Sequence, residues 1–281
     1  MIDKNTKFVI VGLGVLGGSY AQVLSASGYH VTGVDIDADT VSYALEQGWI
    51  EKGGADTSLV KDADIVVCAL YPHVFEEWIR ENGHYLKKGC ILTDVTGVKE
   101  KIIARINALL PLNVEFIACH PMAGRESRGI HFADSSRFKD ANFIIVPTEK
   151  NTEIAIDTAR QLAEILGFTR ISELSAAEHD RMIGFLSQLT HVIAVSLMNV
   201  SDNTHLASYT GDSFRDLTRI AKINEDMWPE LFILNKENLI REIQEFVGEM
   251  NDFCDLIEKE DFDAMKQKMI ISTERRKKFD K

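Results

Sequence analysis

His120 is the residue best placed in this chain for proton transfer. It directly follows the apolar run Phe-Ile-Ala-Cys, so it lies where a predicted strand leaves its sheet. A histidine there can accept a proton near neutral pH, because its ordinary pKa is about 6.5. Its position alone is equally compatible with a structural role, in which the ring only donates a hydrogen bond to a carbonyl of the turn. His179 and His191 lie on a later predicted helix, and their roles stay open.

A glycine-rich turn near the amino terminus has the pattern of a dinucleotide-binding site. Gly12, Gly14 and Gly17 form a G-x-G-x-x-G that follows an apolar run and opens a helical stretch. In this pattern the first glycine permits a tight turn, the second lets the backbone approach a pyrophosphate, and the third lets helix and strand pack closely. The helix amino terminus favours the anion. The residues expected to contact the cofactor are Gly12, Gly14, Leu16 and Gly17.

Asp35 predicts which dinucleotide binds. It ends the second apolar run, where a carboxylate accepts hydrogen bonds from the adenosine ribose. A 2′-phosphate at that place would face Asp35, Asp37 and Asp39, with no nearby Arg or Lys to pair it. The sequence therefore favours NAD over NADP.

The first part of the chain alternates short apolar runs with helical stretches. The apolar runs cover residues 8–12, 30–35, 64–70, 90–95, 115–120 and 142–147. Continuous apolar character indicates strands buried on both faces, and helical stretches between the first five indicate β-α-β repetition. We therefore expect an α/β fold in which residues 1–173 form an NAD-binding domain with a Rossmann-like, doubly wound parallel sheet. Its strand ends would carry the site, because ligands bind outside the carboxyl ends of such strands.

The chain changes character after about residue 174. Ser175 and Glu178 have the spacing of a capping box, and the helix they open is predicted to run to about Val200. A later helical segment repeats apolar residues every three or four positions, at Leu239, Ile243, Phe246, Met250, Phe253 and Ile257. Such a stripe packs on another helix, within the chain or in a second subunit. We expect residues 174–281 to form an all-helical substrate and dimerisation domain, and the protein to be a homodimer.

Composition narrows the class of protein. A length of 281 residues suggests two domains, and a formal charge of −12 argues against nucleic acid, since phosphates need clustered Lys and Arg. No uninterrupted apolar run reaches the roughly 18–20 residues that span a bilayer. None of the four cysteines forms a C-x-x-C pair, which argues against a metal site. We expect a cytoplasmic protein that acts on a small molecule without a membrane partner.

Four further segments resemble motifs of the prephenate and arogenate dehydrogenase family. Residues 120–124 resemble its H-P-M-A-G motif, and residues 94–99 resemble its D-x-x-S-x-K segment. Residues 187–191 resemble its S-H-x-P-H helix motif. Residues 214–221, followed by Met227-Trp228, resemble its F-[KR]-D-x-T-R-I-A…M-W segment. The motifs occur in the family's order and span nearly the whole chain.

The resemblance implies NAD-dependent oxidative decarboxylation of prephenate, or of arogenate, in tyrosine biosynthesis. His120 would take the proton of the ring hydroxyl, the ring carbon would give its hydride to the nicotinamide, and loss of CO2 would complete an aromatic ring. Arg219 matches the arginine that holds a substrate carboxylate, a role suited to its bidentate fork; without the family, an ion pair with Asp216 would explain it equally well. The residues that match positions around the substrate are His191, Gln188 and Trp228.

The chain departs from the family pattern in its pocket residues. Gly97 stands where the family usually has a serine that reaches substrate and nicotinamide, so either Thr96 or a water supplies the hydroxyl. Asp94 opens the same segment and is expected to contact the cofactor. Gln188 replaces the first His of the helix motif and Thr190 replaces its Pro. These changes bear on the choice between prephenate and arogenate.

Two other functions stay compatible with the sequence. One is another NAD-dependent dehydrogenase of the same two-domain plan, acting on a hydroxy acid or an imine. The other is a catalytically silent NAD-binding regulator. The presence of both His120 and Arg219 argues against the regulator, because a silent site would be free to lose them.

Overall fold

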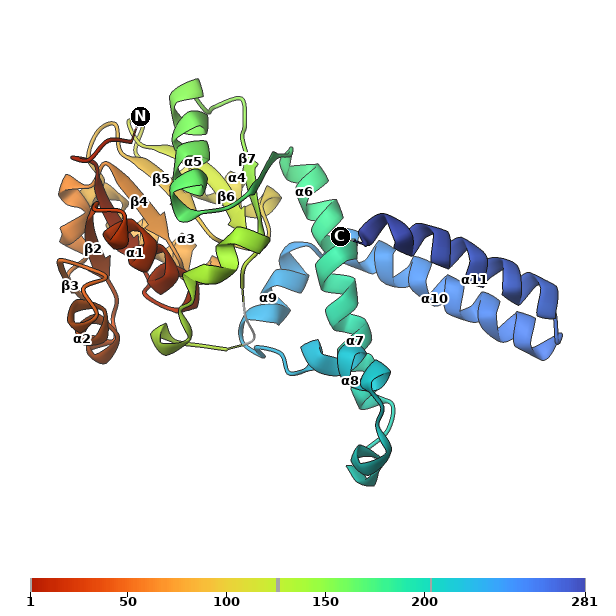
Figure 1. Ribbon diagram of the computed structural model, residues 1–281. Coiled ribbons are helices and arrows are strands. Elements are labelled where there is room, and N and C mark those ends of the chain that lie inside the picture. The colour runs from red at the N-terminus through yellow and green to blue at the C-terminus, as the bar shows by residue number, and fades with distance from the viewer. Residues whose placement is uncertain (1, 125–126, 203, 281) are drawn as a thin grey trace. The chain divides into compact units, whose positions relative to one another are not determined.

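The computed structural model describes residues 2–124, 127–202 and 204–280. Within it the chain divides into two compact units, Met1–Asn235 and Lys236–Lys281, and each is described by itself (Figure 1).

The first unit is built on a sheet whose eight described strands have the order β3-β2-β1-β4-β5-β6-β7-β8. The strands are β1 (Lys7–Val11), β2 (His30–Val34), β3 (Lys52–Gly54), β4 (Ile65–Cys68), β5 (Ile91–Asp94), β6 (Glu115–Pro121), β7 (Asn142–Val146) and β8 (Arg170–Glu173). All neighbours pair in parallel except β6 and β7, which are antiparallel. The order reverses between β1 and β4, which is where open sheets of this kind bind ligands. The predicted α/β fold is confirmed, with two short strands, β3 and β8, that the apolar runs did not predict.

Helices cover both faces of this sheet, as the continuous apolar strands require. One face carries α1 (Val15–Ala26), α2 (Ala38–Glu46) and α5 (Glu153–Leu166), which share a core with Phe8 and Ile10 of β1. The other face carries α3 (Pro72–Asn82), α4 (Glu100–Leu109) and α9 (Met227–Leu234), which share a core with Val9 and Val11. Alternate residues of one strand thus face opposite cores.

Helix α9 therefore packs on the sheet although it follows β8 by more than fifty residues. This contact places residues up to Asn235 in the first compact unit. The boundary predicted between residues 173 and 174 follows the end of β8 and stays a prediction about domain organisation.

A long helix follows β8 and supplies one wall of the site. It consists of α6 (Ala176–Ile183), a π-helical turn η5 (Gly184–Leu189) and α7 (Thr190–Asn199). Ser175 and Glu178 form the predicted capping box, with the Ser175 hydroxyl accepting from the Glu178 backbone nitrogen at 3.3 Å. The predicted end near Val200 is also confirmed. The π turn widens the helix locally, a feature that often accompanies functional sites.

This helix alone, among the described residues, is long and apolar enough to span a bilayer by length and composition. The sequence did not predict this, because polar residues interrupt the apolar run of the helix. Its polar residues His179, Asp180 and Gln188 are buried and hydrogen-bonded inside the first unit. The chain then continues through η6 (Thr204–Tyr209), α8 (Asp212–Thr218) and η7 (Arg219–Ala221) to α9.

The second unit consists of two helices, α10 (Lys236–Glu258) and α11 (Phe262–Arg276), followed by the short turn η8 (Lys277–Phe279). Asp261 caps α11 by accepting a hydrogen bond from the Ala264 backbone nitrogen. Lys268 of α11 pairs with Glu249 and Asp252 of α10, so the two helices lie side by side. Large apolar side chains are nevertheless exposed on both helices, at Ile240, Val247, Met250, Ile257, Met269, Ile270 and Ile271.

Candidate active site

The glycine-rich turn between β1 and α1 has room only for glycine at two of its three positions. Gly12 adopts a φ of 86°, and a Cβ there would stand 2.6 Å from the carbonyl oxygen of Ala69. A Cβ on Gly17 would stand 1.9 Å from the carbonyl oxygen of Gly12. Gly14, by contrast, is the N-cap of α1, and nothing lies within 4 Å of its added Cβ. The turn thus leaves an open approach to the helix amino terminus, which fits a pyrophosphate.

Asp35 stands beside this turn at the end of β2. One of its carboxylate oxygens accepts from the backbone nitrogen of Leu13 at 2.7 Å, and the other accepts from that of Asp37 at 2.9 Å. The carboxylate therefore helps to shape the turn, and its remaining lone pairs are those a ribose would use. Together the open helix end and this acid fit NAD.

A cavity of about 260 Å³ joins the cofactor side of the sheet to the long helix and α9. It lies at the carboxyl ends of β5 and β6. The predicted site residues that line it are Leu16, His120, Gln188, His191 and Trp228. Gly97 also lines it, and a Cβ added there would lie 3.9 Å from Nε2 of His120. The structure thus brings together residues that are up to 212 positions apart in the sequence.

His120 faces the cavity from the end of β6, and a second histidine stands behind it. Its Nδ1 lies 2.8 Å from Nε2 of His179, and Nδ1 of His179 lies 2.7 Å from Oδ1 of Asp180. Burial, and then the neighbouring His179 and Lys99, lower the pKa of His120 well below its ordinary value. His120 is therefore neutral at physiological pH, which is the state that a general base requires.

The sequence assigned no role to His179 and did not indicate Asp180 as a site residue. The feature that could have indicated both is that two polar residues are adjacent on a helix that is otherwise rich in apolar residues. Both side chains are almost completely buried, His179 at 0% and Asp180 at 1% exposure. Polar groups so deeply buried are normally hydrogen-bonded, because burying them without a partner costs free energy.

His191 and Trp228 form a second wall of the cavity. Nδ1 of His191 donates to the carbonyl oxygen of Ser187 at 2.8 Å, and its ring packs on Trp228 with the centroids 3.8 Å apart. Gln188 holds the π turn against α9, because its Nε2 donates to the Leu231 carbonyl at 3.0 Å and its Oε1 accepts from Asn235 at 2.8 Å. Gln188 thus has a structural task whether or not it also contacts a substrate.

Thr96 and Asp94 lie behind the cavity wall rather than on it. The Asp94 carboxylate pairs with Lys99 Nζ at 2.7 Å, and its other oxygen accepts from the Cys119 backbone nitrogen at 3.0 Å. The Thr96 hydroxyl bonds to Asp94 and lies 3.1 Å from Lys99 Nζ. All three side chains are buried.

This placement differs from the expectation that Thr96 reaches the substrate and Asp94 the cofactor. The physical reason is the buried ammonium group of Lys99, which must be paired and hydrogen-bonded to be tolerated inside the protein. Thr96 and Asp94 supply those partners, so their polar atoms point inward.

Arg219 lies apart from the cavity that contains His120. It begins the short turn η7 after α8, its side chain is exposed, and it is absent from the residues that line the cavity in the described part of the chain. The structure therefore does not bring Arg219 together with His120, and its predicted role remains a proposal.

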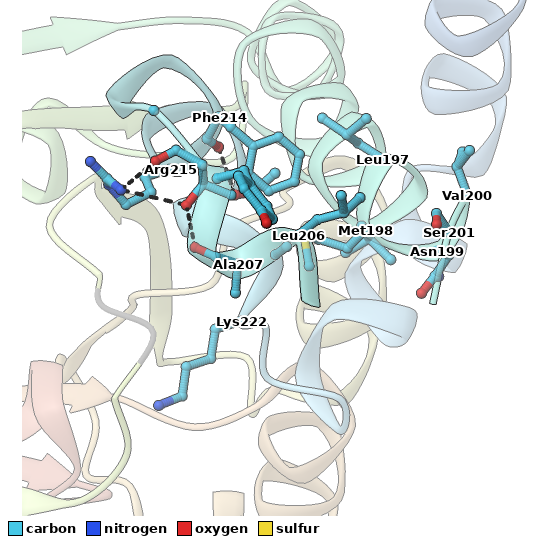
Figure 2. A pocket seen from close by; sticks show the side chains of 16 residues that line it. Leu197, Met198, Asn199, Val200, Ser201, Leu206, Ala207, Phe214, Arg215 and Lys222 are labelled. Atoms are coloured by element: carbon cyan, nitrogen blue, oxygen red, sulfur yellow. Dashed lines mark hydrogen bonds between the residues drawn. The ribbon is translucent and has the colours of Figure 1, made fainter. Parts of the chain in front are cut away.

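A second and larger cavity, of about 970 Å³, lies between α7, η6 and α8. Figure 2 shows its apolar side chains, among them Met198, Leu206 and Phe214, with Lys222 at one side. Arg215 and Thr210, which also line it, are joined by a hydrogen bond from the Arg215 guanidinium to the Thr210 carbonyl at 2.8 Å. None of the predicted site residues lines this cavity among the residues described.

The fold and the first cavity define a dinucleotide-dependent dehydrogenase with a helical carboxyl-terminal part. Residues 20–171 match the family model described as prephenate dehydrogenase, nucleotide-binding domain, and residues 175–270 match prephenate dehydrogenase, dimerization domain. The chain belongs to the prephenate dehydrogenase family.

Relatives and a solved structure agree with this assignment. The chain is 29% identical to prephenate dehydrogenase of Bacillus subtilis, over 93% of this chain and 72% of the relative. It is 30% identical to that of Lactococcus lactis, over 92% and 73%. The crystal structure of Aquifex aeolicus prephenate dehydrogenase with hydroxyphenyl propionate and NAD+ matches it with a TM-score of 0.91 at 27% identity, covering both chains completely. The predicted family, enzyme class and cofactor are confirmed: this is an NAD-dependent dehydrogenase.

Proposed function

We propose that this protein is a cytoplasmic enzyme that oxidises and decarboxylates prephenate to 4-hydroxyphenylpyruvate for tyrosine biosynthesis. The observation that supports this most is the cavity that is lined by a neutral His120, by Leu16 of the cofactor-binding helix and by the packed rings of His191 and Trp228. One small cavity therefore contains a base, a residue beside the cofactor site and an aromatic wall. Oxidation of a ring carbon that carries a hydroxyl requires a base for the hydroxyl proton and a cofactor close to that carbon.

His120 removes the proton of the ring hydroxyl at its Nε2 atom, which faces Gly97 across the cavity. Bound NAD would accept the hydride from the ring carbon that carries this hydroxyl. The C–C bond to the ring carboxylate then breaks as CO2 leaves, and its electron pair completes the aromatic ring. The phenol oxygen recovers the proton from His120, so atoms and charges balance.

Several residues hold the reactants for this step. Gly14 and the amino terminus of α1 bind the pyrophosphate, and Asp35 binds the adenosine ribose. His191 is oriented by the hydrogen bond from its Nδ1 to the Ser187 carbonyl, and with Trp228 it forms the wall against which the substrate ring packs. Arg219 binds a substrate carboxylate, which requires the segment of η7 to approach the cavity when substrate is bound.

NADH formation with prephenate and with arogenate, measured side by side, tests this function. We expect prephenate to be the better substrate. A second candidate is arogenate, since the chain is also 26% identical to cyclohexadienyl dehydrogenase of Zymomonas mobilis, over 91% of this chain and 90% of the relative. Turnover of neither compound, alongside turnover of another hydroxy acid, would contradict both.

We also propose that the protein is a homodimer. The family model that covers residues 175–270 is described as a dimerization domain. The exposed apolar side chains of α10 and α11, such as Met250, Ile257 and Ile270, need a covering surface of the same character. A second copy of the chain offers such surfaces.

Light scattering at micromolar concentration tests the dimer, which we expect at twice the chain mass of 31.5 kDa. Met250→Lys is expected to shift the mass toward the monomer, because it places a charge in the apolar face. Asn251→Lys adds the same charge at the neighbouring exposed position and serves as the control. A wild-type protein with the monomer mass would rule the dimer out.

A further inference from the structure

A continuous chain of hydrogen bonds runs from the backbone of α4 to the ring of His120. The Asp180 carboxylate accepts from the backbone nitrogens of Lys99 at 2.8 Å and Glu100 at 2.9 Å, at the start of α4. It also contacts Nδ1 of His179 at 2.7 Å, and Nε2 of His179 contacts Nδ1 of His120 at 2.8 Å. Three elements, α4, α6 and β6, are joined by this chain.

The direction of every hydrogen bond in this chain follows from its fixed end. Two backbone N–H groups can only donate, so the Asp180 carboxylate beside them acts as an acceptor. Nδ1 of His179 must then carry a hydrogen and donate it to Asp180. In a neutral imidazole the other nitrogen has no hydrogen, so Nε2 of His179 accepts. His120 must therefore donate from Nδ1, which leaves its Nε2 bare.

The bare nitrogen is the one that faces the cavity. Nε2 of His120 lies 3.9 Å from the position of a Cβ on Gly97, and both residues line the cavity. The opposite tautomer would place a hydrogen on Nε2 and could not accept a proton from a substrate. It would also direct two unprotonated nitrogens, one from each ring, at each other.

Neutrality of both rings is favoured by their surroundings. Burial is the main cause that lowers the pKa of His120 and of His179. Among the residues that the structure describes, the charged groups that face the pair are Lys99 and Asp94 from the β5–α4 segment and Asp180 from α6. Lys99 lowers both pKa values, whereas Asp180 and Asp94 raise that of His179.

We propose that His179 and Asp180 are positioning residues that hold His120 in the tautomer with Nε2 free to accept a proton. This inference rests on the proposed function for its catalytic consequence, but the tautomer itself is a property of the protein alone. His179 contacts His120 and not the cavity, so it acts through His120. The orienting partner of a catalytic histidine has the same physical task in other active sites.

The tautomer can be read directly by two-bond ¹⁵N–¹H correlation spectra of the full chain labelled with ¹⁵N-histidine, recorded without substrate at neutral pH. We expect wild-type His120 to carry its hydrogen on Nδ1 and none on Nε2, and His179 to do the same. His120→Asn and His179→Gln spectra assign the signals. A wild-type His120 with its hydrogen on Nε2 would overturn the proposal.

Two substitutions at His179 separate positioning from packing. His179→Leu removes the acceptor, so His120 is expected to move toward the Nε2–H tautomer, and kcat is expected to fall about 10- to 100-fold, the effect of one unmet buried donor. His179→Gln places an amide oxygen near the former Nε2 and is expected to keep the tautomer and most of the kcat. Arg181→Leu, at an exposed position of the same helix, is the control.

The outcomes distinguish this proposal from the proposed function. If His179→Leu kept both the tautomer and kcat, the positioning role would be wrong. If His179→Leu failed to fold, the spectrum of His179→Gln would decide, because an Nε2–H tautomer there would also contradict the proposal. If the wild-type spectra were as expected while neither prephenate nor arogenate was oxidised, the tautomer would stand and the proposed function would fail.

Discussion

The carboxylate of Asp35 accepts a hydrogen bond from the backbone nitrogen of Leu13 at 2.7 Å, which ties the end of β2 to the glycine-rich turn. The residue that would read the ribose therefore also shapes the loop that would bind the pyrophosphate. Because one carboxylate serves both tasks, cofactor choice and loop geometry are coupled in this site.

The first prediction concerns cofactor preference. Asp35→Ser combined with Ile36→Arg is expected to narrow or reverse the preference for NAD, because it removes the charge that repels a 2′-phosphate and adds one that pairs with it. Ile36 is 95% exposed, so an arginine fits there. Loss of a charge-assisted hydrogen bond is worth about 1.5–3 kcal/mol, or roughly 10- to 100-fold in NAD affinity. KM values for NAD and NADP measure it, with Asp62→Ser, at an exposed position outside the acidic cluster that follows β2, as the control. Equal use of both cofactors by the wild type would contradict the prediction.

The second prediction concerns the base. His120→Asn keeps one hydrogen-bonding edge but cannot take the proton, so kcat is expected to fall by about 10²–10⁴-fold. NAD affinity and Tm are expected to stay near wild type, and His84→Asn on the surface is the control. A collapse of Tm would return His120 to a structural role, and failure to bind NAD would make it a cofactor contact.

The third prediction concerns pH. The ordinary pKa of histidine would place the acid limb of kcat/KM near 6.5, but burial lowers the pKa of His120 well below that value. A base is active when unprotonated, so activity is expected to persist below pH 6.5 and to be lost only as pH falls through the lowered pKa. A pH profile of kcat/KM measures this. If kcat/KM instead fell on the acid side with an apparent pKa at or above 6.5, another group would be the base, and His191 would be the first candidate.

The fourth prediction concerns Arg219. Arg219→Ala is expected to raise KM for the substrate about 10- to 100-fold while leaving NAD binding near wild type, because one charge-assisted pair with a carboxylate is lost. Arg219→Lys is expected to recover little, since a point charge does not replace a planar fork. Arg80→Ala, at another exposed arginine, is the control. An unchanged KM would make Arg219 a surface residue, as its exposed position in this structure would also allow.

The fifth prediction concerns the glycine in the cavity wall. Gly97→Ser is expected to fold with an unchanged Tm, because its Cβ would meet nothing closer than 3.6 Å, at Leu231. The added hydroxyl is within reach of a ligand beside His120, so KM for prephenate is expected to fall about 2- to 10-fold, the value of one hydrogen bond. Gly97→Ala tests size without the hydroxyl. Equal effects of the two substitutions would show that volume, and not hydrogen bonding, matters there.

The sequence by itself determined the parallel sheet, the glycine-rich turn with Asp35, and the position of His120 at a strand end. Each of these rests on a local pattern. Apolar runs specify strands buried on both faces, and the spacing of Gly12, Gly14 and Gly17 reflects contacts within one turn and its helix. The capping box at Ser175 is equally local, because its two partners are three residues apart.

Only the tertiary structure decided which polar groups meet across the chain. His120 and His179 are 59 residues apart, and Lys99 and Asp180 are 81 apart, so no periodicity relates them. The same holds for Thr96, whose hydroxyl turns inward because the buried ammonium of Lys99 needs partners. Local patterns report which face of an element is buried; the pairing of buried polar groups depends on how separate elements pack, and this depends on the whole fold.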